Sequence, residues 1–356
     1  MGNQVSTNTK QEKLFKTSKA IDRQIRLDEE RKKSEIKLLL LGTKEAGKST
    51  FFKQLQFSYG SHQLTANDRL EYRSAIFQNI YTSMQFLIQT LDQFQIPLEY
   101  QDLQTDASLF SEPFETLGPS FYFNPLYLHP LEQLWADAGI QKAHRLAGDD
   151  GLPYFFDKLQ TIWAPGYIPN NQDILCCKEQ AQAMNMCKFK IGPYKYKIID
   201  IAGEKIMADD SKKWLHCFDD ISAVLFLVSI NGYDKGTLYD PNSNQMRESL
   251  ILFDAICNSP WFKSTTIIVL LNKMDLFLRK IKHSRVTKYF GDYDGDEANE
   301  EQVIAYFKQR FQSLNRNPQR HIFCDYTNAL DGQLIRQVTM TVFNVIGHNL
   351  DASSLL

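Results

Sequence analysis

The sequence lacks the features that would place it in several large classes of protein. Its 356 residues hold no apolar run long enough to cross a bilayer and no amino-terminal secretory segment. Lys and Arg total 40 against 42 Asp and Glu, so the net charge of -2 gives no overall basic field for nucleic acid. The six cysteines and seven histidines show no zinc, redox or other metal spacing. We therefore expect a cytoplasmic protein with reduced thiols, long enough for two domains and without a nucleic-acid partner.

The amino terminus carries two features that suit a membrane surface. Its first residues fit the pattern for myristoylation of Gly2, with Ser6 at the required position. A helix expected within residues 1–33 then repeats lysine at every third residue, at Lys10, Lys13, Lys16 and Lys19. One acyl chain gives only marginal membrane affinity, and a basic face supplies the second signal. The alternative is a solvated charged helix without a lipid.

A phosphate-binding loop follows. Residues 35–41 read as a buried strand, and the next residues form a complete G-x-x-x-x-G-K-S sequence. Glycines let backbone N–H groups turn toward phosphates, Lys48 approaches the outer phosphates, and Ser49 offers magnesium a hydroxyl. The helix that then begins points its positive end at the anion. The residues expected to bind the nucleotide here are Gly42, Thr43, Lys44, Glu45, Ala46, Gly47, Lys48, Ser49 and Thr50.

A second phosphate element lies further along the chain. A strand predicted over residues 194–199 ends in Asp200-Ile-Ala-Gly203, which is a D-x-x-G sequence. Asp200 would hold magnesium through water, and Gly203 would let the backbone approach the terminal phosphate. The metal ligands expected from the sequence are therefore Ser49 and Asp200.

The base is read by two later motifs. A strand predicted over residues 265–271 leads into Asn272-Lys273-Met-Asp275, an N-K-x-D sequence. The Asp275 carboxylate can accept from N–H groups that guanine presents and adenine does not, while Lys273 lies along the base or sugar. A T-x-A sequence ending at Ala329 follows another predicted strand, and a backbone N–H of this loop would contact the guanine oxygen. In this order the motifs match a GTPase core and no common kinase.

With these motifs the chain resembles heterotrimeric G-protein alpha subunits over nearly its whole length. Further family-like stretches are residues 134–141, 167–169, 212–218 and 252–258. The resemblance implies an α/β fold, with a P-loop GTPase domain that has a mostly parallel six-stranded sheet and flanking helices, and an inserted all-helical domain. The implied parts are an amphipathic, basic amino-terminal helix with the lipid site at 1–33, a Ras-like GTPase domain at 34–60 and 174–356, and an all-helical domain at 61–173. It also implies that Asp150, Gly151 and Leu175 contact the nucleotide, with GTP or GDP and Mg²⁺ as cofactors.

Two other features receive a structural interpretation. Residues 69–92 carry apolar side chains at helical spacing, which indicates a helix of the insert packed into its core. The members of that stripe are Leu70, Ile76, Ile80, Met84, Leu87 and Leu91. Residues 292–297 are acidic like a calcium loop, but the ligand at the twelfth position is missing, so we expect a solvated acidic loop.

The positions that the resemblance makes catalytic hold unusual residues. Lys178 stands where the family has an arginine finger, and Ala181 where it has a magnesium-binding threonine. Glu204 stands where a glutamine orients the attacking water, and Lys44 replaces a loop glycine beside the terminal phosphate. Lysine lacks the planar fork of arginine, alanine has no ligand oxygen, and an ionised glutamate cannot donate. An arginine finger is worth ~10³ to 10⁵ in rate, so with Lys178 and Glu204 as catalytic residues we expect strongly reduced GTPase turnover and weakened Mg²⁺ binding.

Two functions remain open. The first is a guanine-nucleotide-binding signal transducer that relays signals from a membrane receptor at the cytoplasmic face of the plasma membrane. Its expected partners are a G-protein beta-gamma dimer, a G-protein-coupled receptor at the carboxyl terminus, an effector that the sequence does not name, and the membrane. The alternative is a nucleotide-stabilised, non-hydrolysing scaffold at the membrane. A nucleotide-dependent change in Trp214 fluorescence would favour the switch over the scaffold.

Overall fold

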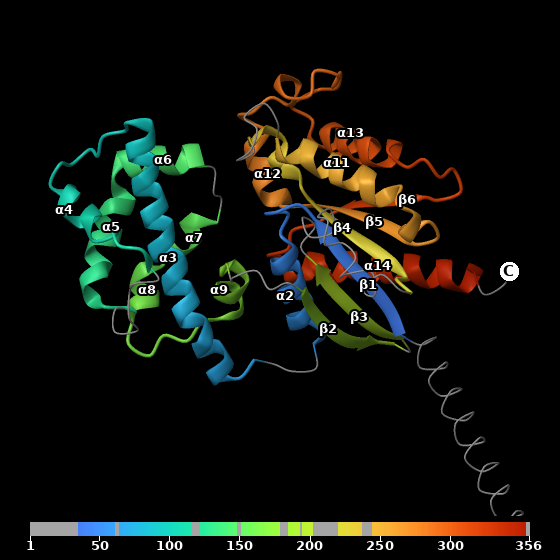
Figure 1. Cartoon of the computed structure of the whole chain (residues 1–356), viewed down its shortest axis with the longest axis horizontal. Coiled ribbons are helices and arrows are strands. Elements are labelled where there is room, and N and C mark those ends of the chain that lie inside the picture. The colour runs from blue at the N-terminus through green and yellow to red at the C-terminus, as the bar shows by residue number, and fades with distance from the viewer. Residues whose placement is uncertain are drawn as a thin grey trace, which may run out of the picture.

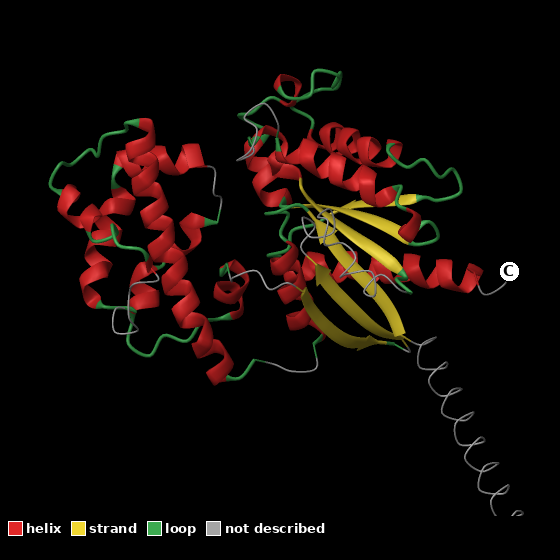
Figure 2. Ribbon diagram, viewed as in Figure 1, coloured by secondary structure: helices red, strands yellow, loops and turns green. Residues whose placement is uncertain are grey.

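The computed structural model describes residues 35–60, 64–114, 122–147, 151–178, 184–192, 194–201, 220–236 and 244–353. These residues form two groups of elements, a sheet with helices on both faces and a separate bundle of helices (Figures 1 and 2). No helix within the described ranges is both long and apolar enough to span a bilayer.

The sheet is mostly parallel. Its strands are β1 (Glu35–Gly42), β2 (Met184–Ile191), β3 (Tyr194–Ile201), β4 (Ala223–Ser229), β5 (Thr266–Asn272) and β6 (Ile322–Tyr326). They run in the order β2-β3-β1-β4-β5-β6, and only the β2–β3 pair is antiparallel. The central strand β4 is buried along its whole length, as expected of a strand covered on both faces. The six-stranded, mostly parallel sheet predicted from the sequence is confirmed.

Each face of the sheet has its own apolar core, because successive strand residues point to opposite sides. In β1, Leu38 and Leu40 face the core shared with helices α2 (Lys48–Tyr59) and α14 (Gly332–Ser353). Leu39 and Leu41 face the core on the other side. The helices on that side are α11 (Gln245–Cys257), α12 (Met274–Lys280) and α13 (Glu300–Ser313). Because β1, β3, β4, β5 and β6 are parallel, the loops that follow their carboxyl ends all lie along the same edge of the sheet.

Within its described residues the second group contains helices and connecting loops but no strand. Its elements are α3 (Ala66–Phe94), α4 (Leu103–Ser108), α5 (Leu128–Ala136), α6 (Ala138–Ala147), α7 (Leu152–Phe156), α8 (Leu159–Trp163) and α9 (Asn171–Cys176). The long helix α3 begins at a reciprocal capping box between Thr65 and Asp68, which satisfies free N–H groups of its first turn. Its predicted apolar stripe is buried from Ile76 to Leu91. Leu70 is the exception, with 40% of its surface exposed, because it lies in the first turns of α3, outside that packed core.

Several predicted element ends shift by a few residues. Strand β3 continues to Ile201, so Asp200 lies inside the strand rather than just after it. The expected boundary between residues 173 and 174 falls within α9, which contacts both α2 and α3. Helix α9 is thus the element through which the helical group meets the sheet group.

Candidate functional site

The loop between β1 and α2 can form only with glycine at two positions. Gly47 has φ of +92°, and a Cβ there would lie 2.2 Å from the Asn272 side-chain nitrogen. Gly42 has φ of +146°, and a Cβ there would lie 2.3 Å from the Leu227 carbonyl oxygen. Both conformations disfavour a side chain, and both contacts are too close for one. The spacing of the two glycines therefore allows the loop to lie directly on its neighbours.

Lys48 is the first residue of α2, and its side chain lies across this loop. Its Nζ donates to the carbonyl oxygens of Gly42 and Thr43, each at 2.8 Å. This places an ammonium group beside the amino terminus of α2, where the unpaired N–H groups of the first turn already favour anions. Ser49 follows on an exposed position of the same turn. The loop, the lysine and the helix end together form a cradle suited to phosphate.

Asn272 joins three loops at this edge of the sheet. The side chain is only 1% exposed, and its Nδ2 donates to the Ala46 carbonyl oxygen at 2.8 Å. Its Oδ1 accepts from the Ala329 N–H at 3.0 Å. The backbone N–H of Thr327 donates to the Leu271 carbonyl oxygen at 2.8 Å, which holds the third loop against β5. The N-K-x-D and T-x-A sequences thus meet the phosphate loop through one buried amide.

Two further residues of the N-K-x-D sequence lie at the start of α12. Lys273 adopts a left-handed conformation with φ of +66° immediately before the helix. The Asp275 side chain, in the first turn, is 38% exposed and makes an ion pair of 3.8 Å with Arg279. Such a surface pair is weak and screened. The Asp275 carboxylate is therefore accessible to a donor arriving from solution.

Asp200 has an oxygen that lacks a hydrogen-bond partner among the described residues. The residue is 7% exposed, and its Oδ1 is buried and unsatisfied. Burial raises the pKa of this carboxyl, while the charge of Lys48 and a hydrogen bond with Asn185 act in the opposite direction. A buried oxygen without a donor is costly unless a ligand or a cation completes it. Asp200 and the exposed Ser49 hydroxyl are oxygen donors of the kind that Mg²⁺ binds.

The helical group reaches the cradle through the end of α9. The Thr50 hydroxyl donates to the Leu175 carbonyl oxygen at 3.4 Å. Lys53, buried on α2, donates from Nζ to the carbonyl oxygens of Ile174 at 3.2 Å and Cys177 at 3.0 Å. These are free carbonyl groups at a helix end, which a cation satisfies well. The sequence reading missed Lys53; its only local signal is a lysine within a run of buried α2 residues.

A side chain from α3 holds the segment that follows α9. Asn79 donates from Nδ2 to the Lys178 carbonyl oxygen at 2.7 Å and accepts from the Lys178 N–H at 2.6 Å. The backbone of Lys178 is therefore fixed from the helical side, and its side chain leaves from an exposed position. Sequence reasoning also missed Asn79, since nothing in its neighbours on α3 marks it.

The remaining predicted site residues divide into those that the structure describes and those that it does not. Lys44 is exposed at the outer side of the loop, between Thr43, which bonds Ser249 of α11, and Glu45, which bonds Gln245 of α11. Gly151 caps the amino end of α7. Five predicted residues lie outside the described ranges, namely Gly2, Asp150, Ala181, Gly203 and Glu204.

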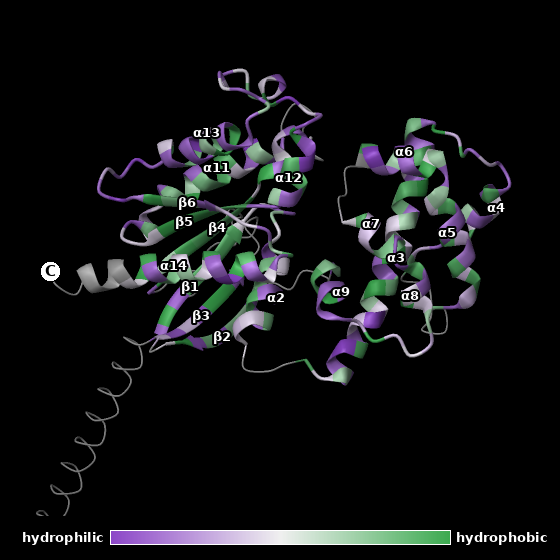
Figure 3. Cartoon of the chain, turned by 180° about the vertical axis from the view of Figure 1, so that it is seen from behind, coloured by the Kyte–Doolittle hydropathy of each residue, from purple (hydrophilic) through white to green (hydrophobic). Residues whose placement is uncertain are grey.

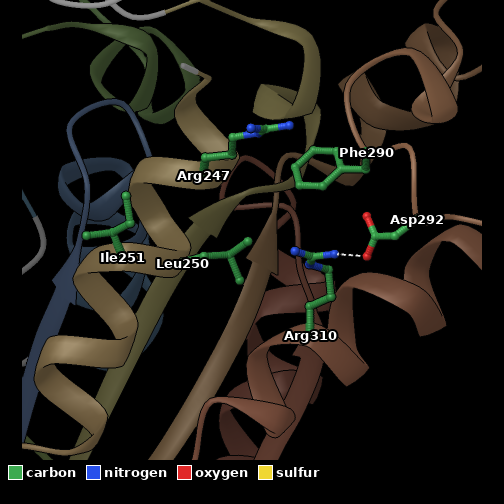
Figure 4. Close-up of a pocket in the computed structure, with 6 residues that line it drawn as sticks. All are labelled: Arg247, Leu250, Ile251, Phe290, Asp292 and Arg310. Atoms are coloured by element: carbon green, nitrogen blue, oxygen red, sulfur yellow. Dashed lines mark hydrogen bonds and ion pairs between the residues drawn. The ribbon is translucent and has the colours of Figure 1, made fainter. Parts of the chain in front are cut away.

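A separate pocket of about 350 Å³ lies away from the cradle, between α11 and α13 (Figure 4). Arg247, Leu250 and Ile251 line it from α11, and Arg310 lines it from α13. Arg310 pairs with Asp292 of the acidic loop, and both arginine groups lie 5.4 Å from the ring centre of Phe290. Its charged groups are thus engaged within the protein, Arg310 with Asp292 and Arg247 with the Tyr289 carbonyl oxygen.

Comparison with known proteins gives one consistent family. The family description "G-protein alpha subunit" matches residues 15–346 of the chain. The chain is 36% identical over 336 residues to the guanine nucleotide-binding protein alpha-2 subunit of Mycosarcoma maydis, covering 93% of each chain. It is 37% identical over 331 residues to the alpha-2 subunit of Neurospora crassa, covering 91% of each. It is also 34% identical over 346 residues to the alpha-17 subunit of Caenorhabditis briggsae, covering 95% of this chain and 96% of that protein.

Proposed function

The chain belongs to the family of G-protein alpha subunits, and on that premise we propose that it binds GTP and GDP in the cradle at the carboxyl edge of its sheet and transduces a signal. The observation that carries this proposal is the joining of three loops by Asn272, with Lys48 across the first of them. This arrangement joins the loop proposed to hold the phosphates to the two loops proposed to hold the base. Alpha subunits are GTP hydrolases that act with beta-gamma dimers and receptors, and we propose these partners for this chain.

Guanine selection is assigned to Asp275. Its carboxylate is accessible and only weakly paired, so guanine N–H groups can replace Arg279 as its donors. Isothermal titration of the purified full chain should give tight binding of GDP and none of ADP. Asp275→Ala should remove that preference, because the site then has no acceptor for the guanine edge. Arg279→Ala is the matched control, since it breaks the same ion pair and leaves the acceptor in place. Equal affinity for GDP and ADP in the unchanged protein would refute the proposal.

We propose that hydrolysis is slow. Lys178 occupies the place where the family resemblance implies an arginine, and its backbone is held by Asn79 rather than free to reposition. A lysine can meet one phosphate oxygen at a time, whereas arginine can hold two. A single-turnover assay should therefore find hydrolysis well below that of an alpha subunit with arginine and glutamine at these positions. The double variant Lys178→Arg with Glu204→Gln should raise the rate; family-typical hydrolysis in the unchanged chain would overturn the idea.

Magnesium binding is proposed to persist in weakened form. The unsatisfied, buried Asp200 oxygen and the Ser49 hydroxyl are the residues that would hold the ion, which when bound would neutralise charge on the phosphates. Ala181 supplies no ligand oxygen. GTP affinity should accordingly rise with Mg²⁺ in the unchanged protein, and Ser49→Ala should reduce that rise. Equal GTP affinity with and without the ion in the unchanged protein would exclude a metal role for Asp200.

Membrane attachment is proposed to use acylation at Gly2 together with the lysine-rich segment that follows it. Mass spectrometry of the chain from its native cells should find a myristoyl group on Gly2. Gly2→Ala should move the protein from membranes to the soluble fraction. A scaffold without switching remains the alternative, and it predicts that protease sensitivity is the same with GTP analogue and with GDP.

A further inference from the structure

Lysines face one another across three neighbouring strands at one end of the sheet. In the antiparallel β2–β3 pair, Lys188 is directly opposite Lys197, and Lys190 is directly opposite Lys195. In the parallel β1–β3 pair, Lys37 is opposite Lys197. Residues opposite each other in neighbouring strands share a face, so these five lysines form one patch, here called the lysine platform. Figure 3 shows hydrophilic residues along β2 and β3 in this part of the sheet.

Within the described residues, the platform has more positive charges than carboxylates paired with them. Lys188 makes an ion pair with Glu35 at 2.9 Å, and Lys37 makes one with Asp220 at 3.7 Å. Among the described residues no carboxylate lies within ion-pair distance of the other three lysines of the platform. Like charges directly opposite in a sheet are destabilising. Two such pairs side by side cost stability, and this points to a role for them outside the packing of the sheet.

The position of the platform links it to the amino-terminal segment. Lys195 is the β3 partner of Glu35, the first residue of β1, and the β2–β3 turn is three residues before it, at Gly192. Figure 1 shows this turn beside the start of β1. Residues 1–34 therefore join the sheet at the platform, and that segment carries the lipid pattern and the lysine repeat. The platform thus lies where the segment that carries the lysine repeat enters the sheet.

We propose that the lysine platform docks on an anionic lipid surface, as a second membrane contact beside the amino-terminal segment. The choice of lysine supports this occupant, because residues 184–201 contain four lysines and no arginine. Lysine is a hydrated point charge on a flexible stem, which suits a diffuse layer of head groups, whereas recognition of single phosphates or carboxylates favours the arginine fork.

The test uses full-length protein made in bacteria, without an acyl group, and vesicles of phosphatidylcholine alone or with 30 mol% phosphatidylserine. The unchanged protein should sediment with the phosphatidylserine vesicles and be released by salt. Each lysine near an anionic surface contributes about fivefold to partitioning. Lys190→Gln with Lys195→Gln should therefore lower binding more than tenfold. The same variant should unfold at a temperature no lower than the unchanged protein, because it removes a like-charge pair.

The matched control is Lys282→Gln with Lys288→Gln, two exposed lysines near α12 that give the same change in net charge. It should leave vesicle binding within about twofold, since the contribution of a lysine falls off within a Debye length of the surface. Equal loss in both double variants would mean that only net charge matters and would overturn the proposal. Binding of a polyglutamate peptide with no preference for phosphatidylserine vesicles would instead assign the platform to an acidic protein. GDP affinity, measured on the same samples, reports on the proposed function separately.

Discussion

Replacing Lys53 by methionine tests how the helical group is held against the sheet. Methionine is unbranched and similar in length to the lysine stem, so the apolar part of the contact is kept and only the ammonium is lost. The ammonium donates to the carbonyl oxygens of Ile174 and Cys177, at 3.2 and 3.0 Å, in a site where the residue is 6% exposed. The substitution therefore leaves two carbonyl groups at the end of α9 without this donor.

The expected loss follows from these two bonds. A hydrogen bond to a charged group contributes about 1.5 to 3 kcal/mol in net terms. Both bonds share one nitrogen, so they do not add fully, and a loss of about 2 to 4 kcal/mol is expected. For a domain of roughly 200 residues, this loss of stability corresponds to a fall in unfolding temperature on the order of 5 to 10 °C. Because α2 carries the phosphate loop, the same change should speed GDP release.

Differential scanning calorimetry and release of a fluorescent GDP analogue measure both effects. Lys263→Met is the control, because Lys263 is exposed and a substitution there should change stability by no more than about 0.5 kcal/mol. If Lys53→Met and Lys263→Met have the same unfolding temperature, the two bonds contribute nothing net. The idea that Lys53 joins the two groups of elements would then be wrong.

Three further outcomes are expected. Gly47→Ala should lower GDP affinity at least tenfold, because the new Cβ would lie 2.2 Å from the Asn272 side-chain nitrogen. Gly192→Ala is the control: this glycine also has positive φ, but a Cβ there meets no atom within 4 Å, so affinity should not change. Asn79→Ala should release the Lys178 backbone and speed GDP dissociation several-fold, with Asn79→Asp intermediate because it keeps only the acceptor; unchanged dissociation would exclude a holding role. A hydrogen bond from the Thr287 side chain and one from its backbone hold the pKa of Glu297 below its usual range, so this group stabilises the fold above its unfolded pKa and the gain is lost as pH falls through the folded value. Glu297→Ala should thus lower the unfolding temperature more at pH 7 than at pH 3, and an equal effect at both would contradict this assignment.

Local patterns predicted the cradle well. The order of strand, loop and helix around Lys48 could be inferred because glycine spacing and strand-forming residues are properties of a short stretch of chain. The end of β3 could not be located in the same way. A polar residue such as Asp200 reads as the end of an apolar strand, yet its backbone pairs with Leu40 on one side and Asn185 on the other. Pairing with neighbours, rather than side-chain polarity, decides where that strand ends.

The residues that sequence reasoning missed share one property. Lys53 bonds carbonyl groups 121 and 124 residues away, and Asn79 bonds a residue 99 positions away. No periodicity or motif in the sequence records such a partnership. The acidic loop gives a related case, because Glu297 accepts from Thr287, 10 residues earlier in the chain. Contacts of this kind become visible only when the fold has brought the segments together.

Lys53 and Asn79 act on the same short segment from opposite sides. Lys53 holds the carbonyl groups of residues 174 and 177 from α2, and Asn79 holds Lys178 from α3. The phosphate loop, α2, the end of α9 and α3 are therefore linked in series by polar bonds. Because Lys178 lies within that series, moving the helical group away from the sheet requires breaking either the bonds from α2, made by Lys53 and Thr50, or those of Asn79. Breaking those of Lys53 carries Lys178 away from the cradle, whereas breaking those of Asn79 leaves Lys178 on the sheet side. Single variants at the two positions should consequently differ in GTP hydrolysis even where both speed GDP release.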